Sequence, residues 1–258
     1  MTPALPSLRP IILFPARLAA TRLPGKPLAD IHGEPMIVHV LRRAEAADIG
    51  PVVVACAEAE IKAAVERAGG RAVLTRPDHP SGSDRIHEAL ESVDPDRHHD
   101  VVVNLQGDQP LIDPAAIRAA LWPLADPAVD IATLAFAIRD PAELDNPNVI
   151  KIAIGFAPGQ RVARALYFSR LPVPYGQGEH YHHPGIYAYR RQALERFVAL
   201  PPAAIERRES LEQLRALAAG MRIDAALVDT VPFGIDTPAD LDRARAMLAS
   251  AAAGTGNS

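Results

Sequence analysis

The chain has 258 residues, of which 48% are hydrophobic and 22% are charged, a composition typical of a globular protein with a substantial apolar core. Its formal net charge of −4 at pH 7 argues against a nucleic-acid-binding surface, which usually carries a basic excess. A single cysteine excludes an intramolecular disulfide and a cysteine metal cluster, and no apolar run is long enough to span a bilayer. Because no secretory signal is evident, we expect a cytoplasmic protein with neither membrane nor nucleic-acid partners.

Apolar runs alternate with helical patterns through the first part of the chain. The run Ile11–Phe14 predicts a buried strand, and a helix is expected from about Pro35, a residue suited to a first helical turn. The following segments predict a strand, a helix, a strand, a helix and a strand, in the order 51–55, 58–68, 72–74, 83–90 and 101–105. This order predicts an α/β fold, a doubly wound and mainly parallel sheet with right-handed crossovers. Cys56 ends one apolar run and is expected to be a buried structural thiol.

The pattern changes between residues 130 and 190. Short strand-like pieces, such as 131–138 and 149–154, are separated there by Pro, Asn and Gly. We expect 130–190 to be an inserted smaller sheet, within a single domain over 1–250, that covers the site or pairs two subunits. Helices are predicted again at 191–200, 206–219 and 238–248. The small and polar residues 251–258 predict a disordered tail.

The loop after the first strand carries three cations, Arg17, Arg22 and Lys26. Ligands of open α/β sheets bind beyond the carboxyl ends of the strands, which is where this loop begins. Crowded cations repel one another unless they share an anion, and a triphosphate would supply that charge. The alternative is that the three side chains are simply solvated. The loop is not a Walker A motif, because Pro27 follows the lysine, and it lacks the glycine spacing of a dinucleotide fingerprint.

Two aspartates stand at the ends of predicted elements. Asp108 lies in a turn after the strand 101–105, where a carboxylate is suited to hold Mg²⁺ on a phosphate. Asp236 lies just before the last predicted helix, and its spacing alone favours a helix cap. Thr237 is an alternative residue for that cap.

The turn Ser81-Gly82-Ser83 opens another predicted helix. Ser81 or Ser83 could cap this helix, and the same turn could offer hydroxyl and backbone donors to a ribose or a base. Arg85 could donate to a carbonyl acceptor. Three histidines, His180, His182 and His183, invite a zinc interpretation, but no paired Asp or Cys ligands accompany them.

A series of short motifs follows in one order along the chain. They are Pro15-Ala16-Arg17, 21–28, 35–41, 81–85, 104–110, 146–151, 165–170, 183–187, 209–215 and 234–238. In this collinear order they resemble the cytidylyltransferases that activate 3-deoxy-D-manno-octulosonate (Kdo). The resemblance covers nearly the whole chain apart from its first ten residues and its tail.

The resemblance implies a nucleotide-diphospho-sugar transferase-like fold, a homodimer, and Mg²⁺ as cofactor. The implied reaction converts CTP and Kdo to CMP-Kdo and pyrophosphate, for lipopolysaccharide biosynthesis. Asp108 and Asp236 become the metal ligands, which reverses the capping interpretation of Asp236. With Arg17, Arg22 and Lys26 on the triphosphate they form the implied catalytic set. The cytosine and ribose are assigned to Ser81, Gly82, Arg85 and Gln106.

The resemblance also implies a sugar pocket, assigned to Arg170, His183, Tyr187, Glu212 and Gln213. Arg170 would meet the sugar carboxylate, and Lys151 is a weaker candidate near the phosphates. His183 and Tyr187 are expected to face one side of a strand, and Glu212 and Gln213 to lie on an amphipathic helix.

Several positions depart from the family pattern. They are Ala20, Gln109, His182, Pro184 and a longer segment at 155–164. These departures touch the phosphate loop and the sugar side, so they leave the choice among keto-sugar acids open. An 8-amino-Kdo or a sialic-type acid is one alternative, and a non-catalytic nucleotide-binding regulator on the same fold is another.

Overall fold

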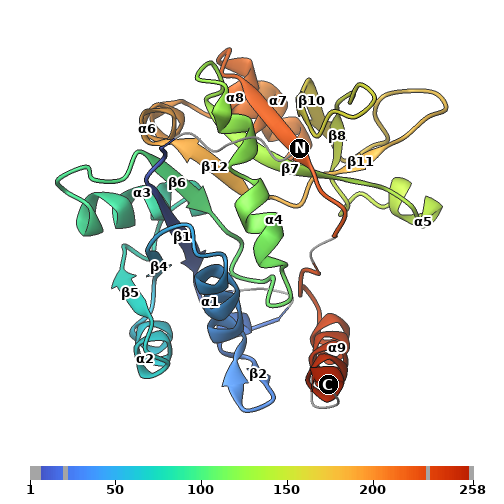
Figure 1. The fold of residues 1–258 in the computed structure, drawn as a ribbon. Helices are drawn as coiled ribbons and strands as arrows, with labels where there is room; N and C mark the ends of the chain where they lie inside the picture. Colours follow the sequence, from blue (N-terminus) through green and yellow to red (C-terminus); the bar gives the residue numbers. More distant parts are fainter. Residues whose placement is uncertain (1–6, 20–22, 231–232, 256–258) are drawn as a thin grey trace. The chain divides into compact units, whose positions relative to one another are not determined.

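The computed structural model describes residues 7–19, 23–230 and 233–255, with side chains as far as residue 250 (Figure 1). The chain divides into two compact units. The first unit contains residues 11–96, 105–114 and 232–258, and the second contains 1–10, 97–104 and 115–231. Each unit has its own strands and helices and is described by itself.

The first unit is built on three parallel strands, β1 (Pro10–Ala16), β4 (Val52–Cys56) and β5 (Arg71–Leu74). β4 pairs with both β1 and β5, and Ile12 of β1 lies opposite Val52. Three helices follow these strands, α1 (Met36–Ala46), α2 (Ala59–Arg67) and α3 (Gly82–Val93). The side chains of Ile11–Phe14 are all buried, as expected of a parallel strand that is covered on both faces.

The end of the chain packs within the same unit. A short 3₁₀ helix, η1 (Lys26–Leu28), precedes a hairpin of β2 (Asp30–Ile31) and β3 (Glu34–Pro35). Helix α9 (Pro238–Thr255) closes a small core formed by Ile31, Met36, Ile235, Leu241 and Ala244. This core fixes the residues just before α9. The helix continues past the predicted end at residue 248 and into the segment for which a disordered tail was expected.

The second unit holds a mixed sheet. Antiparallel pairing joins β6 (Val101–Asn104) to β12 (Tyr187–Arg190) and β12 to β7 (Ile131–Ala137), whereas β13 (Ile223–Leu227) pairs with β7 in parallel. The other antiparallel strands are β9 (Val162–Arg164) on β13, β11 (Tyr181–His182) on β7 and β8 (Lys151–Ala153), and β10 (Tyr167–Ser169) on β8. The helices are α4 (Pro114–Ala119), η2 (Trp122–Ala125), α5 (Pro141–Leu144), α6 (Arg191–Ala199), α7 (Ala204–Glu209) and α8 (Leu214–Ala218). The predicted α/β class is confirmed.

The single helix predicted over 206–219 is wrong. The chain forms α7 and α8 instead, because Ser210 adopts a left-handed conformation with φ of 54° and ends α7. Glu212 and Gln213 therefore lie in the connection between two helices and not on an amphipathic helix face.

The prediction of one strand that carries both His183 and Tyr187 is also wrong. β11 ends at His182, and β12 begins at Tyr187. Between them Gly185 has φ of 77°, a left-handed conformation that strands do not use. The two side chains nevertheless meet across this turn, as described below.

Among the described residues, no helix combines the length and the apolar character needed to cross a membrane.

Candidate active site

Two cavities adjoin the carboxyl end of β1 in the first unit. The larger has a volume of about 400 Å³, and its polar lining comes from Arg17, Lys26, Gln106, Asp108 and Asp236. The smaller has a volume of about 140 Å³, and its polar lining comes from Arg17, His79, Ser81 and Arg85. Pro15, Ala16 and Arg17 line both, so the exposed Arg17 stands where the two cavities meet. The described residues that were predicted for the triphosphate, metal and base thus gather in one unit.

Lys26 lies at the centre of the larger cavity's charged groups. Its Nζ donates to Oδ2 of Asp108 at 2.7 Å and to Oδ1 of Asp236 at 3.2 Å. It also donates to the carbonyl of Ile235 at 2.6 Å. Three oxygens from two distant segments therefore converge on one cation. Since the Lys26 side chain is only 16% exposed, these charge-assisted hydrogen bonds are partly shielded from water.

The cap of α9 is formed by Thr237 and Asp240. The Thr237 hydroxyl accepts from the Asp240 backbone N–H at 3.2 Å, and the Asp240 carboxylate accepts from the Thr237 backbone N–H at 2.9 Å. This reciprocal arrangement satisfies the N-terminal donors of the helix. Asp236 contributes its backbone N–H to the Asp240 carboxylate, while its own carboxylate faces Lys26. The side-chain cap is therefore Thr237 and not Asp236.

The turn that carries Asp108 is held against β1. The Leu105 backbone N–H donates to the carbonyl of Leu13 at 3.1 Å, so the chain runs beside β1 into the turn. A Cβ atom at Gly107 would lie 2.9 Å from the Pro15 carbonyl oxygen, which only glycine avoids. This close approach brings Gln106 and Asp108 to the cavity.

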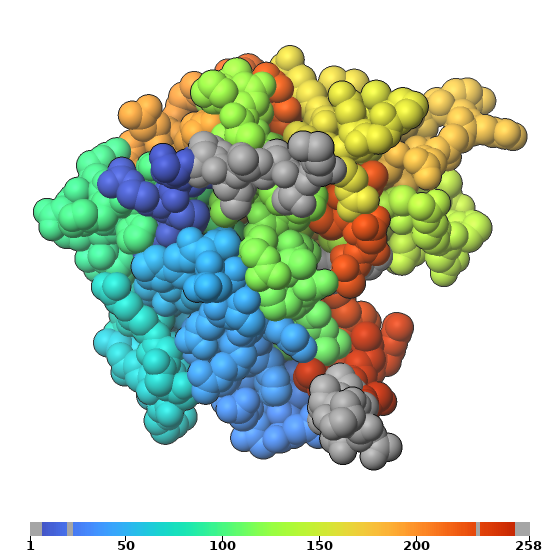
Figure 2. Space-filling model, viewed as in Figure 1, coloured from blue at the N-terminus to red at the C-terminus, as the bar shows by residue number. Residues whose placement is uncertain are grey.

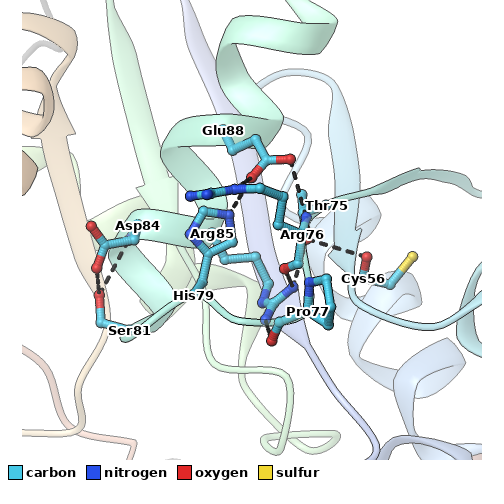
Figure 3. Close-up of polar contacts among 9 residues, drawn as sticks. All are labelled: Cys56, Thr75, Arg76, Pro77, His79, Ser81, Asp84, Arg85 and Glu88. Carbon is cyan, nitrogen blue, oxygen red and sulfur yellow. Dashed lines mark hydrogen bonds and ion pairs between the residues drawn. The ribbon is translucent and has the colours of Figure 1, made fainter.

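Arg85 organises the wall of the smaller cavity (Figure 3). The side chain is 2% exposed, and its guanidinium donates to the Thr75 hydroxyl at 2.6 Å. It also donates to the carbonyls of Arg76 at 2.9 Å and Pro77 at 3.2 Å. Burial lowers the pKa of Arg85, because it removes water from the charged guanidinium. The three oxygen partners replace part of that lost solvation and hold the charge in place. Arg85 thus fixes the loop that leaves β5.

The remaining polar residues at this cavity comprise a helix cap and a hydrogen-bonded histidine. Ser81 caps α3, because its hydroxyl accepts from the Asp84 backbone N–H at 3.2 Å. His79, which the sequence analysis missed, is buried and hydrogen-bonds to Glu88. Although burial acts to raise it, hydrogen bonds from His79 and Arg76 hold the pKa of Glu88 below its usual value. A lone histidine between Asp78 and Pro80 gives no sequence signal of this pairing.

The residues assigned to the sugar lie in the second unit. The rings of His183 and Tyr187 lie 5.2 Å apart, and the Phe168 ring packs edge-on against His183 at 4.8 Å. Burial, together with the nearby charge of Glu212, raises the pKa of Tyr187 well above its usual value. Gln213 is buried where α8 begins. The structure therefore brings Tyr187 beside His183 and within reach of the Glu212 charge.

Arg170 is tied to backbone oxygens. Its guanidinium donates to three carbonyls at 2.8–3.3 Å, those of Pro147, Glu209 and Ser210. Lys151 is fully buried, and its Nζ donates to the carbonyls of Asn146 at 2.6 Å and Arg170 at 3.0 Å. Both cations thus hold turns together within the second unit.

Some sequence predictions fall elsewhere. Arg22 and Ala20 lie outside the described residues. Among the residues that are described, no group of three or more His, Cys, Asp or Glu side chains is placed to hold a metal ion. His180 instead contacts the carbonyl of Pro174. Cys56 is buried as predicted, and burial raises its pKa to about 11.

The fold is that of a nucleotidyltransferase, and the family model described as Cytidylyltransferase matches residues 11–223. The chain is 64% identical over 241 residues to the 3-deoxy-manno-octulosonate cytidylyltransferase of Paramagnetospirillum magneticum, with 93% of this chain and 98% of the relative covered. Identity is 67% over 239 residues to the protein of the same name from Rhodospirillum centenum, with 93% of each covered. A solved structure of CMP:2-keto-3-deoxy-manno-octonic acid synthetase complexed with CTP matches with a TM-score of 0.86 and 41% identity, over 94% of this chain and 99% of that one. The chain belongs to the 3-deoxy-manno-octulosonate cytidylyltransferase family.

Proposed function

We propose that this chain transfers a cytidylyl group from CTP to Kdo, giving CMP-Kdo and pyrophosphate for lipopolysaccharide biosynthesis. The observation that carries the proposal is the larger cavity, where Arg17, Lys26, Asp108 and Asp236 line one space at a strand end. Relatives at 64% and 67% identity that carry the name of this activity support it. A non-catalytic regulator is disfavoured, because it would have no need of two carboxylates around the cavity lysine.

The proposed reaction is a direct displacement. The anomeric hydroxyl of the sugar attacks the α-phosphorus, a new O–P bond replaces the bond to pyrophosphate, and the hydroxyl proton is released. Negative charge grows on the phosphoryl oxygens and the leaving group, and Arg17 and Lys26 would neutralise it. No covalent enzyme intermediate is needed, and Cys56, buried with a raised pKa of about 11, is unsuited to be a nucleophile.

We assign the cofactor Mg²⁺ to Asp108 and Asp236. The donor set fits, because carboxylate oxygens of both residues and the Ile235 carbonyl already surround a cation within 3.2 Å. Mg²⁺ prefers such hard oxygen donors and is often held by one or two carboxylates plus substrate phosphates. When bound, the ion would supply charge neutralisation and orientation at the triphosphate.

The smaller cavity is the proposed base and ribose site. Ser81 and Arg85 line it, and Gln106 lines the adjoining larger cavity. In this assignment Arg85 acts mainly by holding the loop 75–77, since its guanidinium donates hydrogen bonds to Thr75, Arg76 and Pro77 of that loop. The sugar is assigned to Arg170, His183, Tyr187, Glu212 and Gln213 in the second unit.

We further propose a cytoplasmic homodimer. Three large apolar side chains of the second unit, Leu166, Leu171 and Tyr175, are 69%, 70% and 105% exposed. The segment that carries the last of them projects from the second unit at the upper right of Figure 2. Exposed apolar groups clustered along one segment are typical of an interface between copies. Light scattering on Leu171→Glu with Tyr175→Ser tests this, and an unchanged mass for the variant would contradict it.

Pyrophosphate release with CTP and Kdo tests the proposed function directly. We expect CTP to be used well ahead of ATP or GTP, and Kdo ahead of 8-amino-Kdo and sialic-type acids. Equal turnover with ATP would contradict the assignment of the smaller cavity to a pyrimidine base. Binding of CTP without any pyrophosphate release, with each sugar acid supplied in turn, would favour the regulator.

A further inference from the structure

A buried hydroxyl links His183 to the backbone of the second unit. Thr133, on β7, is 0% exposed. Its Oγ1 lies 2.5 Å from the carbonyl oxygen of Ile186 and 3.0 Å from Nε2 of His183. These two contacts join the strand β7 to both ends of the turn that connects β11 to β12.

The direction of both hydrogen bonds follows from proton counting. The Ile186 carbonyl has no proton, so the Thr133 hydroxyl must donate to it. A hydroxyl has one proton, so Thr133 can only accept from His183. Nε2 of His183 therefore carries the ring proton, and in a neutral imidazole Nδ1 then bears a lone pair.

Burial keeps this ring neutral. Burial, followed by the charge of neighbouring His182, lowers the pKa of His183 to about 3. The rings of Phe168 and Tyr187, at 4.8 Å and 5.2 Å, flank the imidazole and oppose its rotation. Among the residues that the structure describes, the Nε2 contact is the hydrogen bond of this ring, and none is made by Nδ1.

We propose that Thr133 is a positioning residue that holds His183 in its Nε2–H form, so that Nδ1 accepts a hydrogen bond from a hydroxyl of the bound sugar acid. The inference rests on the proposed function, because it deepens the assignment of His183 to the sugar. It gives Thr133 a role in sugar affinity without contact to the sugar. CTP affinity should not depend on it, since the nucleotide residues belong to the other unit.

The test compares Thr133→Val, which keeps the shape but removes the hydroxyl, with Thr133→Ser, which keeps the hydroxyl. Full-length protein labelled with ¹⁵N-histidine reports the tautomer of His183 by NMR, and the signals are assigned by their loss in His183→Gln. We expect the Nε2–H form in wild type and Thr133→Ser, and a different tautomer or a mixture in Thr133→Val. The KM for Kdo should rise roughly 3- to 10-fold in Thr133→Val, the effect of one neutral hydrogen bond, while the KM for CTP stays within about twofold.

Three outcomes would overturn the inference. They are an Nδ1–H tautomer in the wild type, an unchanged tautomer in Thr133→Val, and equal rises of both KM values. If Thr133→Val does not fold, the wild-type spectrum and the Kdo KM of Thr133→Ser still decide it. An unchanged KM for Kdo in His183→Gln would contradict the contact between His183 and the sugar. Failure of the proposed function would be seen separately, because the wild type would then release no pyrophosphate.

Discussion

The ammonium of Lys26 lies 2.7 Å from a carboxylate oxygen of Asp108, although 82 positions separate the two residues in the chain. The same ammonium reaches Asp236 at 3.2 Å. A divalent ion held by these carboxylates would need the space that the ammonium takes, because like charges cannot share it. Lys26 and the metal are therefore expected to compete until a triphosphate gives the lysine another anion.

Replacement of Lys26 tests this competition. In Lys26→Met we expect turnover to fall ~10²-fold, because a cation at the developing charge is lost. Without nucleotide, however, Mn²⁺ should bind the variant more tightly than the wild type, since the carboxylates no longer hold an ammonium. Titration of free Mn²⁺ by electron paramagnetic resonance measures this. Lys62→Met, which removes a partly exposed partner of Glu66, is the control. Weaker Mn²⁺ binding by Lys26→Met would contradict competition.

Substitution of the two carboxylates, Asp236 and Asp108, should impair catalysis, whereas substitution of the neighbouring Thr237 should impair stability. Asp236→Asn and Asp108→Asn are expected to lose ~10²-fold or more in rate while remaining folded, because the amide keeps the size but not the charge of the ligand. Thr237→Ala should instead lower stability by about 1 kcal/mol, the usual effect of losing a helix cap. Activity and thermal melting are measured on each variant, with Asp242→Asn on the exposed face of α9 as control. A lower melting temperature with normal turnover in Asp236→Asn would make it a structural residue.

Much of the first unit could be predicted because its signals are local. The alternation of apolar runs and helical patterns indicates parallel strands with their crossovers, and the cations after β1 mark the strand end at which the larger cavity lies. Asp236 could not be assigned from spacing, since the cap is decided by contacts of Thr237 and Asp240. In the second unit Thr133 sits in an apolar strand, and its hydrogen bonds to residues some fifty positions later leave no trace in the local pattern. The break at Ser210 was missed because serine rarely adopts a left-handed conformation.

Arg85 is expected to act through the loop that it holds. In Arg85→Lys an ammonium cannot reach Thr75, Arg76 and Pro77 together, so the buried Thr75 hydroxyl or the part-buried carbonyls of Arg76 and Pro77 lose a charged donor, and stability should fall by about 2–3 kcal/mol. The KM for CTP should rise, because Arg85 itself lines the smaller cavity and the loop it holds leads directly to His79 and Pro80, which also line it. Urea unfolding and steady-state kinetics measure the two effects. Arg76→Lys, at a side chain that is 68% exposed, is the matched control, and equal stability of the two variants would refute the role.

Acid should destabilise this protein through two adjacent histidines. Burial, followed by the charge of Lys151, lowers the pKa of His182 to about 4, and that of His183 falls to about 3. The unfolded chain titrates near 6.5, so it binds more protons than the folded chain between that pH and about 4. Stability is therefore full above pH 6.5 and declines as the pH falls, by up to about 1.4 kcal/mol per pH unit for each histidine. Urea unfolding from pH 7 to pH 4.5 gives the slope of the unfolding free energy against pH, which counts the protons taken up on unfolding. That count should fall by one in His182→Asn and stay as in the wild type in the exposed His98→Asn. Equal slopes in all three proteins would mean that His182 charges in the folded state.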